Sequence, residues 1–146
     1  MRILVDADAC PGKHMIEKAA LENHIKVIMY CDINHQLNSS YSEIKYVESG
    51  FQSVDIVLIN EVKKGDIVIS QDYGLAALVL GKGGYAIGPK GFIYDNDNID
   101  KLLFERHMSG KIRRSGGKTF NPKKRTEEDD KRLYKKLIFL INKAKK

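Results

Sequence analysis

The sequence predicts an α/β protein, a three-layer α/β/α sandwich with a mostly parallel central sheet. Short apolar runs rich in β-branched residues alternate with segments of helical periodicity from residue 2 to residue 108. Because these runs are apolar throughout, they are typical of strands that are buried on both faces. Strands and helices in alternation form parallel βαβ units with right-handed crossovers. A length of 146 residues suits a single domain spanning 1–146.

Five segments have the composition of strands, and apolar residues recur every three or four positions in the segments between and after them. The strands are expected at 2–5, 25–30, 43–47, 66–70 and 85–87, and the helices at 14–23, 54–62, 74–80, 98–108 and 126–144. Ser53 is the expected N-cap of the second helix, in which Ile56 and Ile59 should face inward. Four apolar residues of the last helix should pack on the body: Leu133, Leu137, Leu140 and Ile141.

The charge is divided unevenly along the chain. Residues 1–110 carry 11 Lys and Arg against 15 Asp and Glu, whereas residues 111–146 carry 14 against 4. Residues 109–125 are rich in Gly, Ser, Lys and Arg and are expected to form a basic loop. Such a loop suits a polyanion, with Arg113, Arg114 and Lys118 as candidate phosphate contacts. A solvated basic terminus that only maintains solubility is the alternative interpretation.

The sequence argues against a membrane-spanning protein and against a secreted one. No apolar run approaches the roughly 20 residues that a membrane-spanning helix needs, so no membrane partner is expected. The chain opens directly into a strand without the features of a signal peptide, and its two cysteines lack the spacing of metal or redox sites. A cytoplasmic protein with reduced thiols is the simplest expectation.

Aspartates follow two of the predicted strands. Asp6 comes directly after the run 2–5, with Asp8 two residues later, and Asp72 follows 66–70. Ligands bind at the carboxyl ends of the strands in open α/β sheets, so these side chains are expected to lie near one another. Asp55, near the start of the second helix, is a fourth candidate. Helix capping is the alternative role for Asp55 and Asp72.

Clustered carboxylates repel one another unless a cation lies between them. Asp oxygens suit a hard divalent ion, Mg²⁺ or Mn²⁺, which can activate water and stabilise the leaving oxygen in phosphodiester hydrolysis. We therefore predict a metal site at Asp6, Asp8, Asp55 and Asp72, with Asp6 and Asp72 as catalytic residues. The neighbouring Cys10 is expected to be a packed, inert thiol; a reactive thiolate near a helix start is the alternative.

Several motifs, in this order, resemble the YaiI/YqxD family of bacterial proteins, which is grouped with the PIN-like domains. They are VDADACP (5–11), SVDIVLIN (53–60), KKGDIVISQDYGLAALVLGKG (63–83), DNIDKLLFERHMSGKIRRSGGKT (97–119) and the following NPKK. The resemblance covers nearly the whole chain. It implies a PIN-like fold. Because PIN domains are nucleases with an acidic cluster for Mg²⁺ or Mn²⁺, it also implies such an ion as cofactor and a nucleic acid as partner, with RNA expected before DNA.

The resemblance also assigns residues to the PIN motifs. Asp6 is similar to the first metal-binding Asp, Asp8 stands where PIN domains often have Asn, and Asp72 resembles the later Asp. Asp55 looks like the second Asp of a helix motif that often reads Asp-Ala-Ala-Asp. Gln52 stands at the first position of that motif, which removes one possible ligand.

Three functions are therefore weighed. The leading hypothesis is a metal-dependent nuclease acting on RNA phosphodiesters. The second is a haloacid-dehalogenase-like phosphatase, with Asp6 as nucleophile and Asp8 as acid/base, although Cys10 replaces the usual Thr or Val of that motif. The third is a catalytically inactive PIN-like module that binds nucleic acid or a protein, which Gln52 favours.

Overall fold

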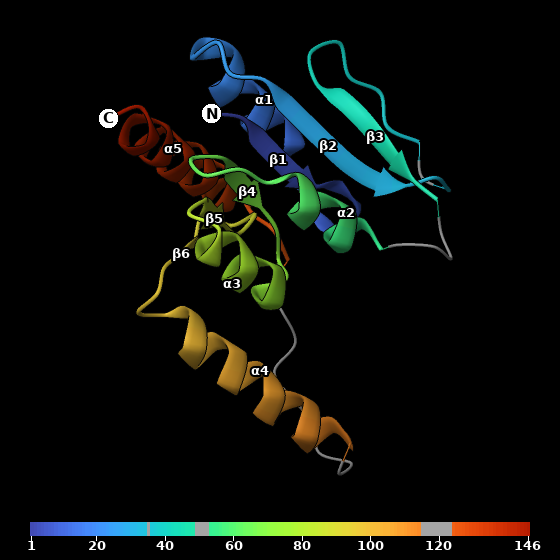
Figure 1. The fold of residues 1–146 in the computed structure, drawn as a ribbon, viewed down its shortest axis with the longest axis vertical. Coiled ribbons are helices and arrows are strands. Elements are labelled where there is room, and N and C mark those ends of the chain that lie inside the picture. Colours follow the sequence, from blue (N-terminus) through green and yellow to red (C-terminus); the bar gives the residue numbers. More distant parts are fainter. Residues whose placement is uncertain (35, 49–52, 115–123) are drawn as a thin grey trace.

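A six-stranded sheet with the order β3-β2-β1-β4-β5-β6 forms the centre of the molecule (Figure 1). Its strands are β1 (Ile3–Asp6), β2 (Val27–Asp32), β3 (Glu43–Val47), β4 (Ile67–Ile69), β5 (Tyr85–Ile87) and β6 (Ile93–Tyr94). All neighbours from β3 to β5 are parallel, and β6 pairs antiparallel with β5. The computed structural model describes residues 1–34, 36–48, 53–114 and 124–146, with the backbone alone for 9 and 110–114. The predicted α/β class is confirmed.

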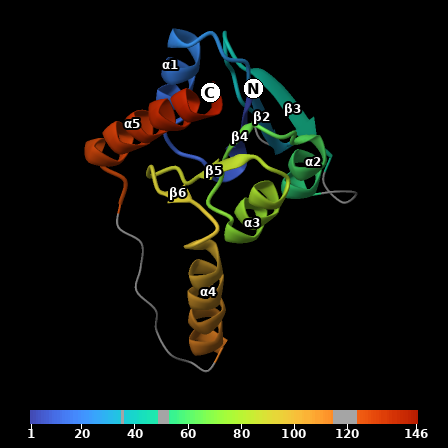
Figure 2. The same ribbon diagram turned by 60° about the vertical axis from the view of Figure 1, so that its left-hand side comes forward.

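Helices cover both faces of the sheet, which makes the three layers (Figures 1 and 2). The helical segments are the 3₁₀ turn η1 (Ala7–Ala9) and the helices α1 (Lys13–Glu22), α2 (Val54–Glu61), α3 (Tyr73–Gly81), α4 (Ile99–Arg114) and α5 (Glu127–Ala144). One core cluster lies between the sheet and α1 and α5. The other lies between the sheet and α2, α3 and the start of α4.

Successive side chains along each strand point to opposite faces of the sheet and so enter the two core clusters in turn. In β1, Ile3 and Val5 belong to the cluster under α1 and α5, whereas Leu4 belongs to the cluster under α2 and α3. Ile67 and Val68 of β4 divide in the same way. Because both faces are covered, residues 3–5 of β1 and all of β4 are apolar, which is the pattern that made these strands recognisable in the sequence.

α5 packs against α1 through the four apolar residues expected from its periodicity, Leu133, Leu137, Leu140 and Ile141, all of them buried. Its N-cap is Thr126, whose side chain accepts a hydrogen bond from the backbone N–H of Asp129 while the Asp129 carboxylate accepts one from Thr126. This capping box fixes the point at which the helix begins.

Three features of the fold differ from the sequence predictions. β6 was not predicted, because a two-residue strand carries no measurable periodicity. The basic loop was expected from residue 109, but α4 continues to Arg114; the Lys and Arg of that stretch are good helix formers and favour the last turn. In α2, Leu58 is buried and Ile56 is 46% exposed, since an almost wholly apolar helix gives no unique inward face.

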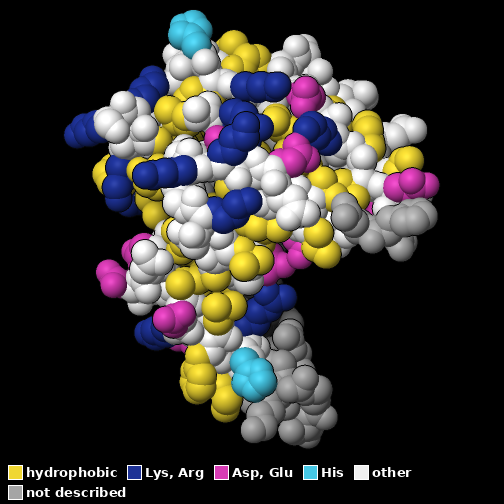
Figure 3. Space-filling model, viewed as in Figure 1, with side chains coloured by type: hydrophobic (Ala, Val, Ile, Leu, Met, Phe, Trp, Pro, Cys, Tyr) yellow, Lys and Arg dark blue, Asp and Glu magenta, His cyan; other side chains and the backbone are white. Residues whose placement is uncertain are grey.

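α4 extends away from the body of the molecule (Figures 1 and 2). Only its first turns pack, with Ile99 buried and Leu102 and Leu103 half-buried against the cluster under α3. On the face shown in Figure 3, most Lys and Arg side chains lie over the body above α4. Within the described ranges, no helix has both the length and the apolar character needed to span a membrane.

Candidate functional site

The carboxyl ends of β1 and β4 form the topological switch point of the sheet. From β1 the chain crosses to β2 on one side, while β4 pairs with β1 on the other. The connections that leave two such neighbouring strands diverge, and the resulting crevice is where α/β proteins bind their ligands. Asp6 is the last residue of β1, and Ser70 and Asp72 directly follow β4. The structure therefore places two of the predicted site residues at this crevice.

A short chain of hydrogen bonds connects the two strand ends. The Ser70 hydroxyl donates to Oδ2 of Asp6 at 3.0 Å and accepts from the backbone N–H of Asp72 at 3.0 Å. Ser70 is only 2% exposed, so its single side chain links the Asp6 carboxylate to the turn after β4. Ser70 was not among the predicted site residues, although its position at the end of the apolar run was the available signal.

Asp6 is held in an environment that opposes its negative charge. Burial raises the pKa of the Asp6 carboxyl above its usual value, and the hydrogen bond from Ser70 lowers it. The negative charges of Asp8, Asp55 and Asp72 raise it further. The other three predicted carboxylates thus lie close enough to act on Asp6 electrostatically. A bound cation would relieve both the burial penalty and the repulsion.

Asp8 and Asp55 approach the cluster from other elements. Asp8 lies in η1, and both of its carboxylate oxygens accept from the backbone N–H of Asp32, at 3.0 and 3.1 Å. This contact ties η1 to the end of β2. Asp55 lies in the first turn of α2 and is half-buried. Ser53 is the N-cap residue of α2, as predicted, but its side chain makes no capping hydrogen bond.

Asp72 is the N-cap of α3. Its Oδ1 accepts from the backbone N–H of Gly74 at 2.9 Å and of Leu75 at 3.3 Å. The capping role considered for Asp72 from the sequence is therefore present. The same oxygen lies 3.3 Å from Nη1 of Arg106, which reaches it from α4. Asp72 thus joins the end of β4, the start of α3 and the middle of α4.

The side chains are suited to a hard cation but are not arranged as a closed cage. No group of three or more His, Cys, Asp or Glu side chains among the described residues is close enough to hold a metal ion. Mg²⁺ is typically held by one or two carboxylates, with waters and substrate phosphates completing its coordination. Asp6 and Asp72 stand at adjacent strand ends, and both side chains offer the carboxylate oxygens that such an ion binds.

The predicted phosphate contacts are only partly described. Arg113 and Arg114 lie in the last turn of α4, where the structure describes the backbone alone, and Lys118 lies outside the described residues. The basic residue that does reach the site is Arg106. It falls one turn after Leu102 and Leu103 on the helix stripe, and that spacing was the sequence signal for its position on the side of α4 that reaches Asp72.

A cavity of about 560 Å³ lies beside the carboxylates. Gln71 and Tyr73, the chain neighbours of Asp72, line it together with residues of the β5–β6 turn, α4 and the segment just before α5. Tyr94 lines it too, and its hydroxyl donates to the Ser70 carbonyl at 3.3 Å. Burial raises the pKa of Tyr94, so its hydroxyl stays protonated at neutral pH. The cavity and the carboxylate cluster therefore share the segment from Ser70 to Tyr73.

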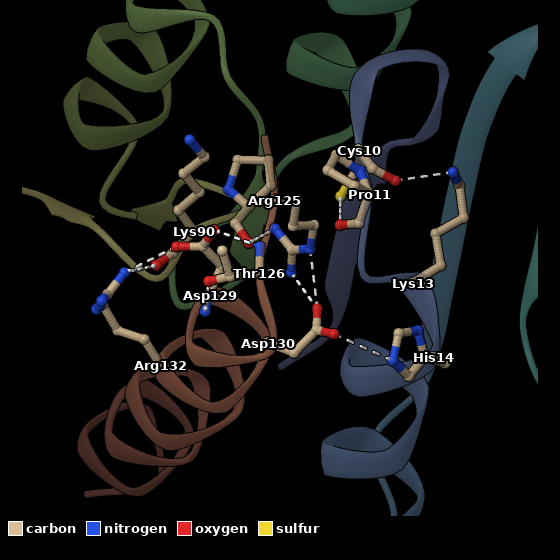
Figure 4. A network of polar contacts seen from close by, with 11 residues as sticks. Cys10, Pro11, Lys13, His14, Lys90, Arg125, Thr126, Asp129, Asp130 and Arg132 are labelled. Carbon is tan, nitrogen blue, oxygen red and sulfur yellow. Dashed lines mark hydrogen bonds and ion pairs between the residues drawn. The ribbon is translucent and has the colours of Figure 1, made fainter. Parts of the chain in front are cut away.

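Cys10 lies near this crevice but has the properties of a structural thiol. It is 2% exposed, and burial raises its pKa to about 12. Its Sγ lies 3.5 Å from the Pro11 carbonyl, and its own carbonyl accepts from Nζ of Lys13 (Figure 4). A thiol of this kind is protonated at neutral pH and is a poor nucleophile, which agrees with the inert role expected for it.

Comparison with known proteins places these residues in a family. The model of the uncharacterised YaiI/YqxD family matches residues 4–143. A UPF0178 protein of Clostridium tetani is 88% identical over 146 residues, which are 100% of both chains. A UPF0178 protein of Clostridium novyi is 68% identical over 99% of this chain and 97% of the relative, and one of Clostridium kluyveri is 65% identical over 97% and 93%. No solved structure matches the chain.

Proposed function

This chain belongs to the YaiI/YqxD family, and we propose that it is a divalent-metal-dependent nuclease that hydrolyses RNA phosphodiesters. The observation that carries the proposal is the placement of Asp6 and Asp72 at adjacent strand ends, linked through Ser70. The ends of these two strands flank the topological switch point of the sheet, and α/β proteins bind ligands at such points. With Cys10 and Cys31 both free, we place the activity in the cytoplasm, where thiols stay reduced.

The residues of the chain have distinct roles in this proposal. Asp6 and Asp72 would hold Mg²⁺ or Mn²⁺, with Asp8 and Asp55 adding negative charge around it. Such an ion polarises the phosphate and lowers the pKa of bound water. Ser70 orients the Asp6 carboxylate by donating to one of its oxygens. Arg106 is paired with Asp72, and in this proposal its guanidinium leaves that carboxylate to bind a substrate phosphate. Further phosphates of the RNA would be bound by Arg113, Arg114 and Lys118.

The test compares the wild-type protein with Asp6→Asn on RNA in the presence of Mn²⁺. Asn keeps the size of Asp and an oxygen that accepts from Ser70, but it lacks the charge. Asp97→Asn, at an exposed aspartate outside the cluster, is the matched control. We expect cleavage by the wild type and by the Asp97 variant, a loss of at least about a hundredfold in the Asp6 variant, and none in EDTA. Equal cleavage by all three proteins, or by none, would overturn the proposal.

One observation favours a second function, a PIN-like module that binds nucleic acid without cleaving it. The described side chains contain no three-ligand group, and the Arg106 guanidinium already lies 3.3 Å from Asp72. RNA binding with a steep salt dependence but no turnover in Mn²⁺ would support that function. A beryllofluoride adduct on the Asp6 carboxylate, which mimics an aspartyl phosphate, would instead support the haloacid-dehalogenase-like phosphatase.

A further inference from the structure

We infer that the cavity beside Asp72 is a binding pocket for a nucleobase of a single-stranded nucleic acid. The inference rests on the proposed function for its choice of ligand, and it adds a base-contacting site to the phosphate chemistry. The volume of about 560 Å³ lies within the range of roughly 300–1,000 Å³ that is typical of small-ligand pockets. Its wall combines aromatic rings with cationic and amide side chains, the groups that bind nucleobases.

Three rings line the cavity and are packed edge to face. Tyr94 is the central ring, 5% exposed, with Tyr73 at 5.7 Å and Phe92 at 5.5 Å between ring centroids. Phe92 is 48% exposed, an unfavourable state for a large apolar ring in water. A flat base stacked on it would remove that surface from water. Because every base has a π-face, such a contact accepts any base.

The turn that carries Phe92 is fixed by close packing. A Cβ on Gly88 would come within 2.9 Å of the Tyr94 hydroxyl, and one on Gly91 within 2.8 Å of the Arg132 backbone. The N–H of Gly88 donates to the Phe92 carbonyl at 2.8 Å. A ring held on such a turn is preorganised, so little conformational entropy is lost when a ligand stacks on it.

Two arginines, Arg125 just before α5 and Arg132 within it, hold the same turn by donating to its carbonyl groups. Nη1 of Arg125 donates to the Pro89 carbonyl at 2.7 Å, and Nη1 of Arg132 to the Lys90 carbonyl at 3.4 Å (Figure 4). Arg125 is itself anchored by Asp130, with Nη2 at 2.7 Å from Oδ1. Arg125 and Lys90 line the same cavity as the rings and are its cationic side chains. Aromatic rings together with cations complement a base with an attached phosphate.

The position of the cavity connects it to the carboxylates. Gln71 and Tyr73 flank Asp72 in the chain, so a base seated in the cavity brings the adjoining backbone toward the proposed metal site. Gln71 presents an amide, which can pair with the edge of a base. A base within a duplex cannot enter such a cavity without leaving its stack, which makes unpaired bases the ligand.

The test measures binding of a short fluorescein-labelled single-stranded RNA by anisotropy in EDTA, where metal-dependent cleavage is absent. Phe92→Ala removes the exposed ring, Phe92→Tyr keeps it, and Phe139→Ala removes a ring of similar exposure, 56% against 48%, on α5 and outside the cavity. We expect Phe92→Ala to weaken binding about tenfold, and the Tyr and Phe139 variants to bind like the wild type. An RNA of the same length with abasic sites should bind the wild type as weakly as intact RNA binds Phe92→Ala.

Equal affinities of the wild type and Phe92→Ala, or equal affinities for intact and abasic RNA, would overturn the base pocket. That result would leave the nuclease proposal standing if the wild type cleaves RNA in Mn²⁺. Conversely, a base-dependent affinity without cleavage would uphold the pocket and reject the nuclease. The two proposals therefore fail separately.

Discussion

Gly12 offers a direct test of how Arg125 is held at the cavity. Gly12 has a φ of +82°, and a Cβ placed there would overlap Nη2 of Arg125 and come within 3.1 Å of a Leu133 methyl. Gly65 has nearly the same backbone, with φ +89°, but nothing lies within 4 Å of its would-be Cβ. Gly12→Ala and Gly65→Ala therefore share the cost of a left-handed alanine and differ in the contacts with Arg125, the closer one, and with Leu133.

The magnitudes follow from these contacts. A left-handed alanine costs roughly 1–2 kcal/mol, offset by about 0.5 kcal/mol through the lower entropy of the unfolded chain, so Gly65→Ala should lose about 1 kcal/mol of unfolding free energy. Displacing Arg125 breaks its hydrogen bonds to Pro89 and Asp130. The side chains of Arg125 and Asp130 are 18% and 23% exposed, so these hydrogen bonds are mostly shielded from water. Their loss should therefore lower the unfolding free energy by about 2 kcal/mol. Gly12→Ala should then lose about 3 kcal/mol.

Urea denaturation of the two variants measures the difference, and Gly12→Ala should also melt about 6 °C below Gly65→Ala. The double variant Gly12→Ala/Arg125→Ala completes the cycle: without the guanidinium, the extra loss at Gly12 should largely disappear. If both glycine variants lose the same free energy, or if the extra loss persists without Arg125, then Arg125 is not packed on Gly12 as described.

Two further predictions concern the carboxylates. The pKa of Asp6 is raised in the folded protein by burial and by its acidic neighbours, so its ionisation destabilises the fold above that pKa and has no such effect below the unfolded value of about 4. Without metal, Asp6→Asn should therefore have a higher unfolding free energy than the wild type at pH 7, and this difference should shrink toward pH 4. The variant should also lose the stabilisation by Mn²⁺. A difference in unfolding free energy that does not change with pH would contradict this reasoning. Arg106→Gln removes the exposed cation from Asp72 and should tighten Mn²⁺ binding up to about fivefold in calorimetry, whereas weaker binding would show that Arg106 supports the site.

The fold was predictable because its strands are buried on both faces. The stretches 3–5 and 67–69 are apolar at every position, and the structure shows that their alternate side chains enter two separate clusters. The same uniformity is why the inward face of α2 was predicted incorrectly. Its residues are apolar nearly all round, so the burial of Leu58 in place of Ile56 depends on how the helix is rotated on the sheet. That rotation is a property of the packed structure.

Some residues of the candidate site could be placed from the sequence and others could not. Asp6 and Asp72 could be placed at one edge because a parallel sheet fixes where strand ends lie, whatever the details of packing. Ser70 and Arg106 could not, since a serine at a strand end and an arginine on a helix stripe have many roles. Their role here comes from contacts across the chain: Ser70 meets Asp6 64 residues away, and Arg106 meets Asp72 34 residues away.

The contact between Arg106 and Asp72 also gives α4 a place in the proposed chemistry. Asp72 is pinned at the start of α3 by two backbone N–H groups, all through Oδ1, so it cannot turn without uncapping that helix. Arg106 is 57% exposed on a helix that extends from the body, and it is the freer partner of the pair. A metal ion or a phosphate arriving at the crevice would therefore displace the arginine and leave the aspartate in place. Binding at the carboxylates would then release a contact of α4, the helix that carries Arg113 and Arg114, before it changed any other element.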